Sequence, residues 1–171
     1  EDDKIVFFDD VSTDLPEKIY NRFNILKSID QVKNYAEKTG DNTFVLGIGN
    51  PRHRETLYKK FTNIGLTPAT LIANSVEKGS FDVVIKTGVN IMSGTVITNS
   101  ITIGKGCLIN LNCTIGHDCE IGDFVEISPY VNVSGRCKIG RNSSIGTNAI
   151  IIPDVTIGEN VVVGAGTLVL K

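Results

Sequence analysis

Two adjacent side chains in the second half of the sequence, His117 and Asp118, have the chemistry of a proton-accepting pair. They lie within "CTIGHDCEIGDF" (Cys113–Phe124). A neutral imidazole can take a proton from a nucleophile, and a carboxylate can fix its tautomer and stabilise the imidazolium. Adjacent residues of an extended segment point apart, so a direct contact between the two requires a corner in the chain. On the residues alone, the alternative is a solvated turn histidine. The only other histidine, His53, is expected on the surface of a polar helix.

A six-residue repeat surrounds this pair. Isoleucine or valine occupies every sixth position from Ile85 to Val169, and glycine often follows, at Gly104, Gly116, Gly122, Gly140, Gly146, Gly158 and Gly164. A period of six matches neither an α-helix nor an alternating strand. It predicts short β segments joined by turns, with three repeats in each coil and the Ile side chains stacked inside. Glycine after each Ile fits a corner where a side chain would be crowded.

The stacked Ile and Val positions of the repeat are called ladder positions. All four cysteines lie two residues before a ladder position, in one phase of the repeat: Cys107, Cys113, Cys119 and Cys137. We therefore interpret them as small buried apolar residues and not as zinc ligands, which would have to converge on one point. Cys119 and Cys137 are one coil apart, so a disulfide between them is the alternative. Reduced thiols favour a cytoplasmic location.

The first half of the sequence predicts an α/β unit. "KIVFFDD" (Lys4–Asp10), "TFVLGIGN" (Thr43–Asn50) and "TPATLIA" (Thr67–Ala73) alternate with two helices. The first helix has capping-box spacing at Ser28 and stops at Gly40, and the second begins at Pro51. Ligands of parallel α/β sheets bind at the carboxyl ends of strands. The residues at those ends are Asp9, Asp10, Gly47, Gly49 and Asn50. The alternative for the two glycines is that they form ordinary turns and bind no ligand.

The composition argues against some functions. The net charge of −2 and the lack of a basic run argue against nucleic acid as the main partner. No stretch approaches the length of a membrane span. The chain begins at Glu1 without a methionine, so we expect a part of a longer protein.

The hexad repeat in "IGKGCLINLNCTIGHDCEIGDFVEISPYVNVSGRCKIG" resembles the hexapeptide-repeat acyltransferases, which fold as left-handed parallel β-helices. With "FFDD", "LGIGN" and "VVVGAGTLVLK", the chain is similar to the bacterial sugar acetyltransferases of the sialic acid O-acetyltransferase type. That group includes N-acetyltransferases of nucleotide-linked 4-amino sugars. The resemblance implies a truncated Rossmann-like domain over residues 1–76, followed by an all-β left-handed parallel β-helix over residues 77–171. It also implies a role in bacterial glycan biosynthesis.

The same resemblance implies a site and an assembly. The family forms homotrimers, with acetyl-CoA between two subunits, a nucleotide sugar held by the N-terminal domain and no metal. His117 matches the general base, supported by Asp118. The implied substrate-binding residues are Asp9, Asp10, Gly49 and Asn110. The implied acetyl-CoA contacts are Gly135, as an oxyanion donor, with Gly146, Thr147, Gly164 and Ala165.

The sequence departs from the family at three points. The first strand, glycine-rich loop and helix of the Rossmann-like domain are missing, as is the tail beyond Lys171. Glu126 stands where several relatives have a second histidine near the CoA thiol.

Three functions compete. The first is N-acetylation of a nucleotide-activated amino sugar. The second is O-acetylation of a sialic-acid-type sugar, which the same histidine can serve. The third is a non-catalytic β-helix scaffold. A zinc site of three histidines is excluded, because the repeat region contains only His117.

Overall fold

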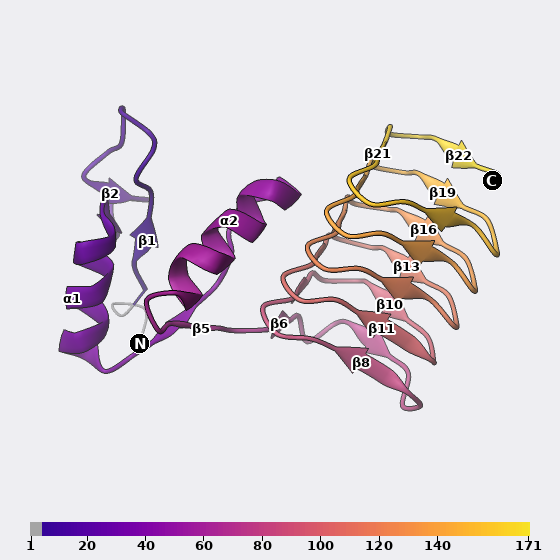
Figure 1. Ribbon diagram of the computed structural model, residues 1–171, viewed down its shortest axis with the longest axis horizontal. Helices are drawn as coiled ribbons and strands as arrows, with labels where there is room; N and C mark the ends of the chain where they lie inside the picture. Colours follow the sequence, from indigo (N-terminus) through magenta and orange to yellow (C-terminus); the bar gives the residue numbers. More distant parts are fainter. Residues whose placement is uncertain (1–4) are drawn as a thin grey trace. The chain divides into compact units, whose positions relative to one another are not determined.

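Stacked β coils make up most of the structure, as the six-residue repeat predicts (Figure 1). The computed structural model describes residues 5–171, so Lys4 of the predicted N-terminal run lies outside the described residues. The chain divides into one unit that ends at Asn42 and a second that runs from Thr43 to Lys171. This division differs from the boundary expected between residues 76 and 77, because residues 43–76 are part of the same unit as the coils.

Each coil contains three short strands, one in each of three sheets. From β8 onward, each strand pairs in parallel with the equivalent strand of the next coil, three repeats along the chain. The first sheet contains β6 (Leu71–Ile72), β9 (Asn90–Ile91), β12 (Leu108–Ile109), β15 (Glu126–Ile127), β18 (Ser144–Ile145) and β21 (Val162–Val163). The second contains β7 (Glu77–Lys78), β10 (Val96–Ile97), β13 (Thr114–Ile115), β16 (Asn132–Val133), β19 (Ile150–Ile151) and β22 (Leu168–Val169). The third contains β8 (Val83–Ile85), β11 (Ile101–Ile103), β14 (Glu120–Ile121), β17 (Lys138–Ile139) and β20 (Thr156–Ile157).

The ladder positions form the core of the coils. Those from Ile91 to Val163 belong to one buried apolar cluster, and Ile85 and Val169 pack against it at the two ends. Burying one side chain of this size contributes about 1.5–3 kcal/mol to the free energy of unfolding. The predicted parallel β-helix with inward Ile ladders is therefore confirmed.

Every sixth residue from Asp82 to Gly166 lies in the left-handed region, with φ between 50° and 75°. This position is three residues after a ladder position, so it marks the turn between two sheets. Gly, Asn and Asp tolerate the left-handed region best, and they fill most of these positions. Phe124, Tyr130 and Arg136 adopt it as well. The glycine that directly follows a ladder Ile has a different role, which is to make room for the next coil.

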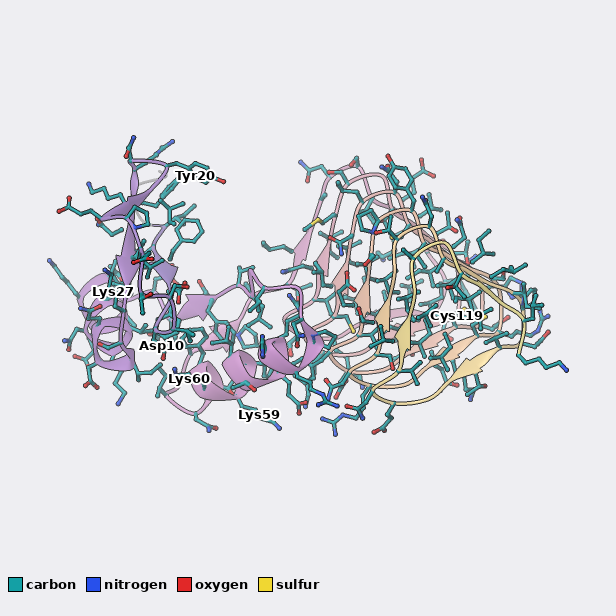
Figure 2. The ribbon with its side chains drawn as sticks, turned by 90° about the horizontal axis from the view of Figure 1, so that it is seen from above. Asp10, Tyr20, Lys27, Lys59, Lys60 and Cys119 are labelled. Atoms are coloured by element: carbon teal, nitrogen blue, oxygen red, sulfur yellow. The ribbon has the colours of Figure 1, made fainter. Side chains whose placement is uncertain are left out.

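The buried thiols also satisfy backbone groups at the corners. Six side chains of this phase each donate a hydrogen bond to the carbonyl oxygen 15 residues further on, over 2.8–3.1 Å: Thr95, Cys107, Cys113, Cys119, Cys137 and Ser143. All four cysteines are free and buried, and Cys119 lies within the stack of coils (Figure 2). Burial raises the pKa of the Cys107 thiol to about 12, so the thiol keeps the proton that it donates. The cysteines are thus small buried residues, as predicted, and hydrogen-bond donors as well.

The unit that ends at Asn42 contains β1 (Phe7–Phe8), β2 (Lys18–Ile19), β3 (Phe23–Leu26) and helix α1 (Ile29–Thr39). β3 pairs in parallel with β1 and antiparallel with β2. Ser28 caps α1 by accepting a hydrogen bond from the Gln31 backbone N–H, and Gly40 ends it in the left-handed conformation. The predicted helix limits are confirmed.

The second unit opens with β4 (Thr43–Phe44), helix α2 (Pro51–Thr62) and β5 (Thr67–Pro68). β4 and β5 pair in parallel as a separate two-stranded sheet. Asn50 caps α2 through hydrogen bonds from the backbone of Arg52 and His53. The predicted Rossmann-like sheet is not found, because β1, β2 and β3 form one sheet, β4 and β5 form another, and β6 pairs with β9 of the coils. Neither helix of residues 5–171 is long and apolar enough to cross a membrane.

Helix α2, which carries Lys59 and Lys60 in Figure 2, is attached to the coils by charged side chains. Arg54 is fully buried and donates to the carbonyl oxygens of Gly106 and Cys107 in the coils, and to those of Leu46 and Ile48 before the helix. Desolvation lowers the pKa of Arg54 to about 10, so the guanidinium stays charged near neutral pH. Glu55 adds hydrogen bonds to Arg141 (2.6 Å) and Asn142 (2.8 Å).

The stacking of coils predicts unequal effects of alanine at two glycines in one column. A β-carbon at Gly122 would lie 2.7 Å from the backbone nitrogen of Arg141 in the next coil, whereas at Gly158 the nearest atom would be 3.8 Å away. Gly122→Ala is therefore expected to lower the free energy of unfolding by about 1–3 kcal/mol. Gly158→Ala is the matched control and should leave it nearly unchanged. Guanidinium denaturation of both variants measures the difference, and equal stabilities would contradict the close approach of the coils.

Candidate active site

The three turns of each coil form three corners along the stack. The helix corner lies between the third and first sheets (residues 104–106, 122–124, 140–142 and 158–160). The Asn110 corner lies between the first and second sheets (residues 110–112, 128–130, 146–148 and 164–166). The His117 corner lies between the second and third sheets (residues 99–100, 117–118, 135–136 and 153–154). Arg54, Glu55 and Tyr58 of α2 cover the helix corner, with the Tyr58 ring against Phe124. The predicted site residues of the coils lie at the other two corners.

His117 and Asp118 are in direct contact. The His117 Nδ1 atom lies 2.6 Å from Asp118 Oδ2, and both side chains are more than half exposed. Asp118 is the left-handed residue of its turn, with a φ of 59°, and this turn brings the adjacent side chains together. When Nδ1 donates to the carboxylate, the lone pair of the neutral ring is on Nε2. The pair therefore presents Nε2 as a base.

Gly135 lies one coil beyond His117, against the imidazole. A β-carbon added at Gly135 would lie 2.6 Å from His117 Nε2, so only glycine leaves the ring its place. The two coils are joined here by hydrogen bonds from Arg136 N to His117 O (2.7 Å) and from Asp154 N to Gly135 O (3.1 Å). Within residues 5–171 the Gly135 N–H donates no hydrogen bond, so this donor is available beside the base.

An ion pair between Arg136 and Asp154 lies next in this corner. Arg136 binds Asp154 through two hydrogen bonds of 2.6 and 2.9 Å. Asp154 raises the pKa of Arg136, and the guanidinium in turn lowers the pKa of Asp154. The guanidinium of Arg136 is bound by Asp154, so the carboxylate of Asp118 contacts the His117 imidazole and not Arg136.

The Asn110 corner carries the predicted acetyl-CoA contacts other than Gly135. Backbone hydrogen bonds stack position 110 on position 128, position 128 on position 146, and position 146 on position 164. Thr147, Gly164 and Ala165 are exposed, and Gly146 is half-buried. Small residues thus leave an open edge beyond Asn110. Sequence reasoning did not place Ser128 and Ser144 at this corner and assigned no role to Glu126. The visible signal was Glu126 itself, an acid at a sheet position that apolar or small residues otherwise fill.

The predicted residues of the N-terminal half lie elsewhere. Asp9 accepts hydrogen bonds from the backbone of Ser12 and Val11 and from the Ser12 hydroxyl, and these bonds lower its pKa. Asp9 and Asp10 belong to the unit that ends at Asn42. Gly49 belongs to the coil unit, one residue after Ile48, whose carbonyl oxygen Arg54 binds at 2.7 Å. Asp9 thus closes a turn, and substrate binding by these three residues stays a prediction.

Asn110 and His117 follow strands of different sheets, so within one chain they lie at different corners. One chain therefore presents an imidazole base and a donor at one corner, and an amide beside small residues at another. No group of three or more His, Cys, Asp or Glu side chains in the described part of the chain could hold a metal ion.

Comparison with protein families and solved structures shows which proteins this fold is similar to. Residues 136–171 match the family of bacterial transferase hexapeptides (six repeats). A search of curated proteins finds no match. Among solved structures, the chain is similar to a variant of perosamine N-acetyltransferase from Caulobacter crescentus in complex with CoA and GDP-perosamine. The two are 26% identical with a TM-score of 0.84, over 90% of this chain and 72% of that protein.

The acetyltransferase domain of PglB from Neisseria gonorrhoeae, in complex with acetyl coenzyme A, is also 26% identical, with a TM-score of 0.85 over 96% of this chain and 77% of that one. WeeI from Acinetobacter baumannii shares the fold, at 24% identity and a TM-score of 0.67 over 96% of this chain and 82% of WeeI. The resemblance to hexapeptide-repeat sugar acetyltransferases and the prediction of an acyltransferase are thereby confirmed. The predicted cosubstrate, acetyl-CoA, is bound in the PglB structure, and CoA is bound in the perosamine N-acetyltransferase structure.

The contact between Gly135 and the imidazole predicts a specific loss of activity. In Gly135→Ala the new methyl group would displace the His117 ring, which can rotate outward without moving the backbone. We expect acetyl transfer to fall by about 10–100-fold, because a shift of the base of about 1 Å has this cost. The melting temperature should stay close to that of the parent protein, and Gly158→Ala, at the helix corner, should keep full activity. Full activity in Gly135→Ala would show that the imidazole does not work in this position.

Proposed function

We propose that the chain transfers the acetyl group of acetyl-CoA to the amine of a nucleotide-activated amino sugar, with His117 as the general base. The observation that carries the proposal is the His117–Asp118 contact of 2.6 Å, which makes Nε2 the basic nitrogen next to a free backbone N–H at Gly135. The structural similarity to perosamine N-acetyltransferase supports the choice of acceptor.

The residues of the His117 corner fit each step of acyl transfer. The acceptor nitrogen forms a bond to the acetyl carbon while the bond between that carbon and the CoA sulfur breaks. His117 Nε2 takes the proton that the nitrogen loses. The imidazolium then donates this proton to the departing CoA thiolate. Asp118 stabilises the imidazolium in the meantime. The Gly135 N–H is a suitable donor to the carbonyl oxygen as negative charge develops on it.

Both open corners contribute to the proposed site, which therefore needs a second copy of the chain. His117 and Asn110 lie at different corners of one stack, so the Asn110 corner of a neighbouring copy would complete the site. A contact between unlike patches generates a ring when its rotation closes after a whole number of copies. Three copies follow from the resemblance to homotrimeric acetyltransferases. The exposed small residues beyond Asn110 then leave room for the CoA arm along the edge between copies.

The residues that bind the nucleotide and the sugar are proposed from the family resemblance. Gly49 lies in the segment tied to the coils by Arg54, and Asp9 and Asp10 lie in the other unit. Contacts between the nucleotide sugar and these residues remain a proposal from the family resemblance. The cytoplasmic location also stays a prediction.

The general-base role predicts a large effect on turnover. His117→Ala should lower kcat by about 10²-fold or more, with a smaller effect on the KM for acetyl-CoA. Asp118→Asn should lie between the parent and His117→Ala, since Asp118 orients the base without replacing it. Steady-state kinetics with a panel of amino-sugar nucleotides measure these effects, and a near-normal kcat in His117→Ala would refute the role.

A site shared between copies predicts complementation. His117→Ala and Asn110→Ala should each lose about 90% or more of the parent activity when tested alone. After the two are unfolded together and refolded as a mixture, about a quarter of the sites should contain an intact His117 facing an intact Asn110. Acetyl transfer should recover to about that fraction of the parent level. No recovery in mixed oligomers, verified by differently tagged chains, would mean that both residues act within one chain.

A further inference from the structure

Glu126 is a buried carboxylate on the outer face of the first sheet. It is the first residue of β15 and is 9% exposed. Three side chains donate hydrogen bonds to it: Asn110 Nδ2 at 2.9 Å, Ser144 Oγ at 2.7 Å and Ser128 Oγ at 3.0 and 3.2 Å to the two oxygens. These donors come from three successive coils, so the carboxylate joins the coils at the Asn110 corner.

Neutral groups hold this carboxylate. Among residues 5–171 no lysine or arginine forms an ion pair with Glu126. Arg54 is the cation in its electrostatic range, where the negative charge of Glu126 counteracts part of the desolvation that lowers the Arg54 pKa. A buried charge without an ion-pair partner is costly unless hydrogen bonds satisfy it. Three donors do so here, and one of them is the amide of Asn110.

The contact fixes the orientation of that amide. Asn110 Nδ2 donates both to Glu126 Oε1 and to the carbonyl oxygen of Ile127, at 2.9 and 3.0 Å. Turning the amide over would place Asn110 Oδ1 against a carboxylate oxygen and a carbonyl oxygen, where three acceptors would face one another. The donors of Asn110 are therefore engaged, and Oδ1 is left as a pure hydrogen-bond acceptor at the corner.

We propose that Glu126 is a positioning residue, which holds Asn110 so that Oδ1 accepts a hydrogen bond from the acceptor amine. The inference rests on the function proposed above. A neutral amine has two hydrogens and a lone pair. One N–H can bind Asn110 Oδ1 and the second can face His117 Nε2 of the neighbouring copy, while the lone pair attacks the acetyl carbon. A hydroxyl has a single hydrogen and cannot serve both atoms. The pair of Glu126 and Asn110 thus selects an amine over a hydroxyl.

The kinetic test is a double-mutant cycle on the full chain. Glu126→Ala and Asn110→Ala should each lower kcat/KM for the amino-sugar nucleotide by about 10-fold or more. The double variant should be no worse than Asn110→Ala, because Glu126 acts through that residue. Glu126→Gln keeps one acceptor oxygen and should recover part of the loss. Glu120→Ala is the matched control, since Glu120 holds the equivalent position in the third sheet, and it should be unchanged. Additive losses, or a loss in Glu120→Ala of the same size, would overturn the proposal.

A second readout does not need turnover. In ¹H–¹⁵N spectra, the Asn110 side-chain amide should show slow hydrogen exchange in the parent protein, because its donors are engaged. In Glu126→Ala the exchange should become faster and the resonances should move, while thermal melting shows whether the coils stay folded. Unchanged Asn110 resonances in Glu126→Ala would refute the positioning role even in an active enzyme. If the parent protein acetylates no amino-sugar nucleotide, the proposed function fails, and these spectra still decide whether Glu126 orients Asn110.

Discussion

The placement of each coil directly on the next, at an interval of three repeats, is the constraint on which the rest of the structure depends. Each residue is fixed between the equivalent residues of the coils before and after its own. The ladder side chains fill the interior, and glycines remain where the next backbone comes too close for a β-carbon. Thiol and hydroxyl groups satisfy corner carbonyls of the neighbouring coil. The same interval places Gly135 against His117, so the packing of the coils also builds the candidate active site.

Two buried charges show how this scaffold accommodates polar groups. Arg54 donates only to backbone carbonyl oxygens, and Glu126 accepts only from neutral side chains. In each case the partners belong to different segments, so the charge acts as a cross-link. Arg54 joins the segment before α2 to the coils, and Glu126 joins three coils at the Asn110 corner. Removing either side chain would leave several donors or acceptors unpaired, which is costlier than the loss of one surface ion pair.

The sequence predicted the coils well because their period is long, regular and carried by two β-branched residues, Ile and Val. The ladder from Ile85 to Val169 and the buried phase of the cysteines are both found. The left-handed residue of each turn was missed, although Asn, Asp and Gly recur at that position, because a side-chain pattern reports burial more directly than backbone conformation. In the N-terminal half, strand, helix and cap residues were visible in the sequence. Which strands pair depends on contacts between distant residues, and the expected single parallel sheet is not found. For the site, the resemblance supplied His117 and Asp118, whereas the hydrogen bonds of Glu126 required coordinates.

A threefold cross-section makes the positions of functional residues sensitive to changes in chain length. Removing one six-residue repeat from the segment between Asp118 and Gly135 would keep an apolar residue at every inward position, so the interior would tolerate the deletion. Every later residue would nevertheless move to another corner, and His117 would then face Arg141 in place of Gly135. Removing one whole coil would shorten the stack and leave the corners in register. Only insertions or deletions of whole coils therefore keep each later residue at its own corner, so the tolerated unit of length change in this scaffold is the coil and not the six-residue repeat.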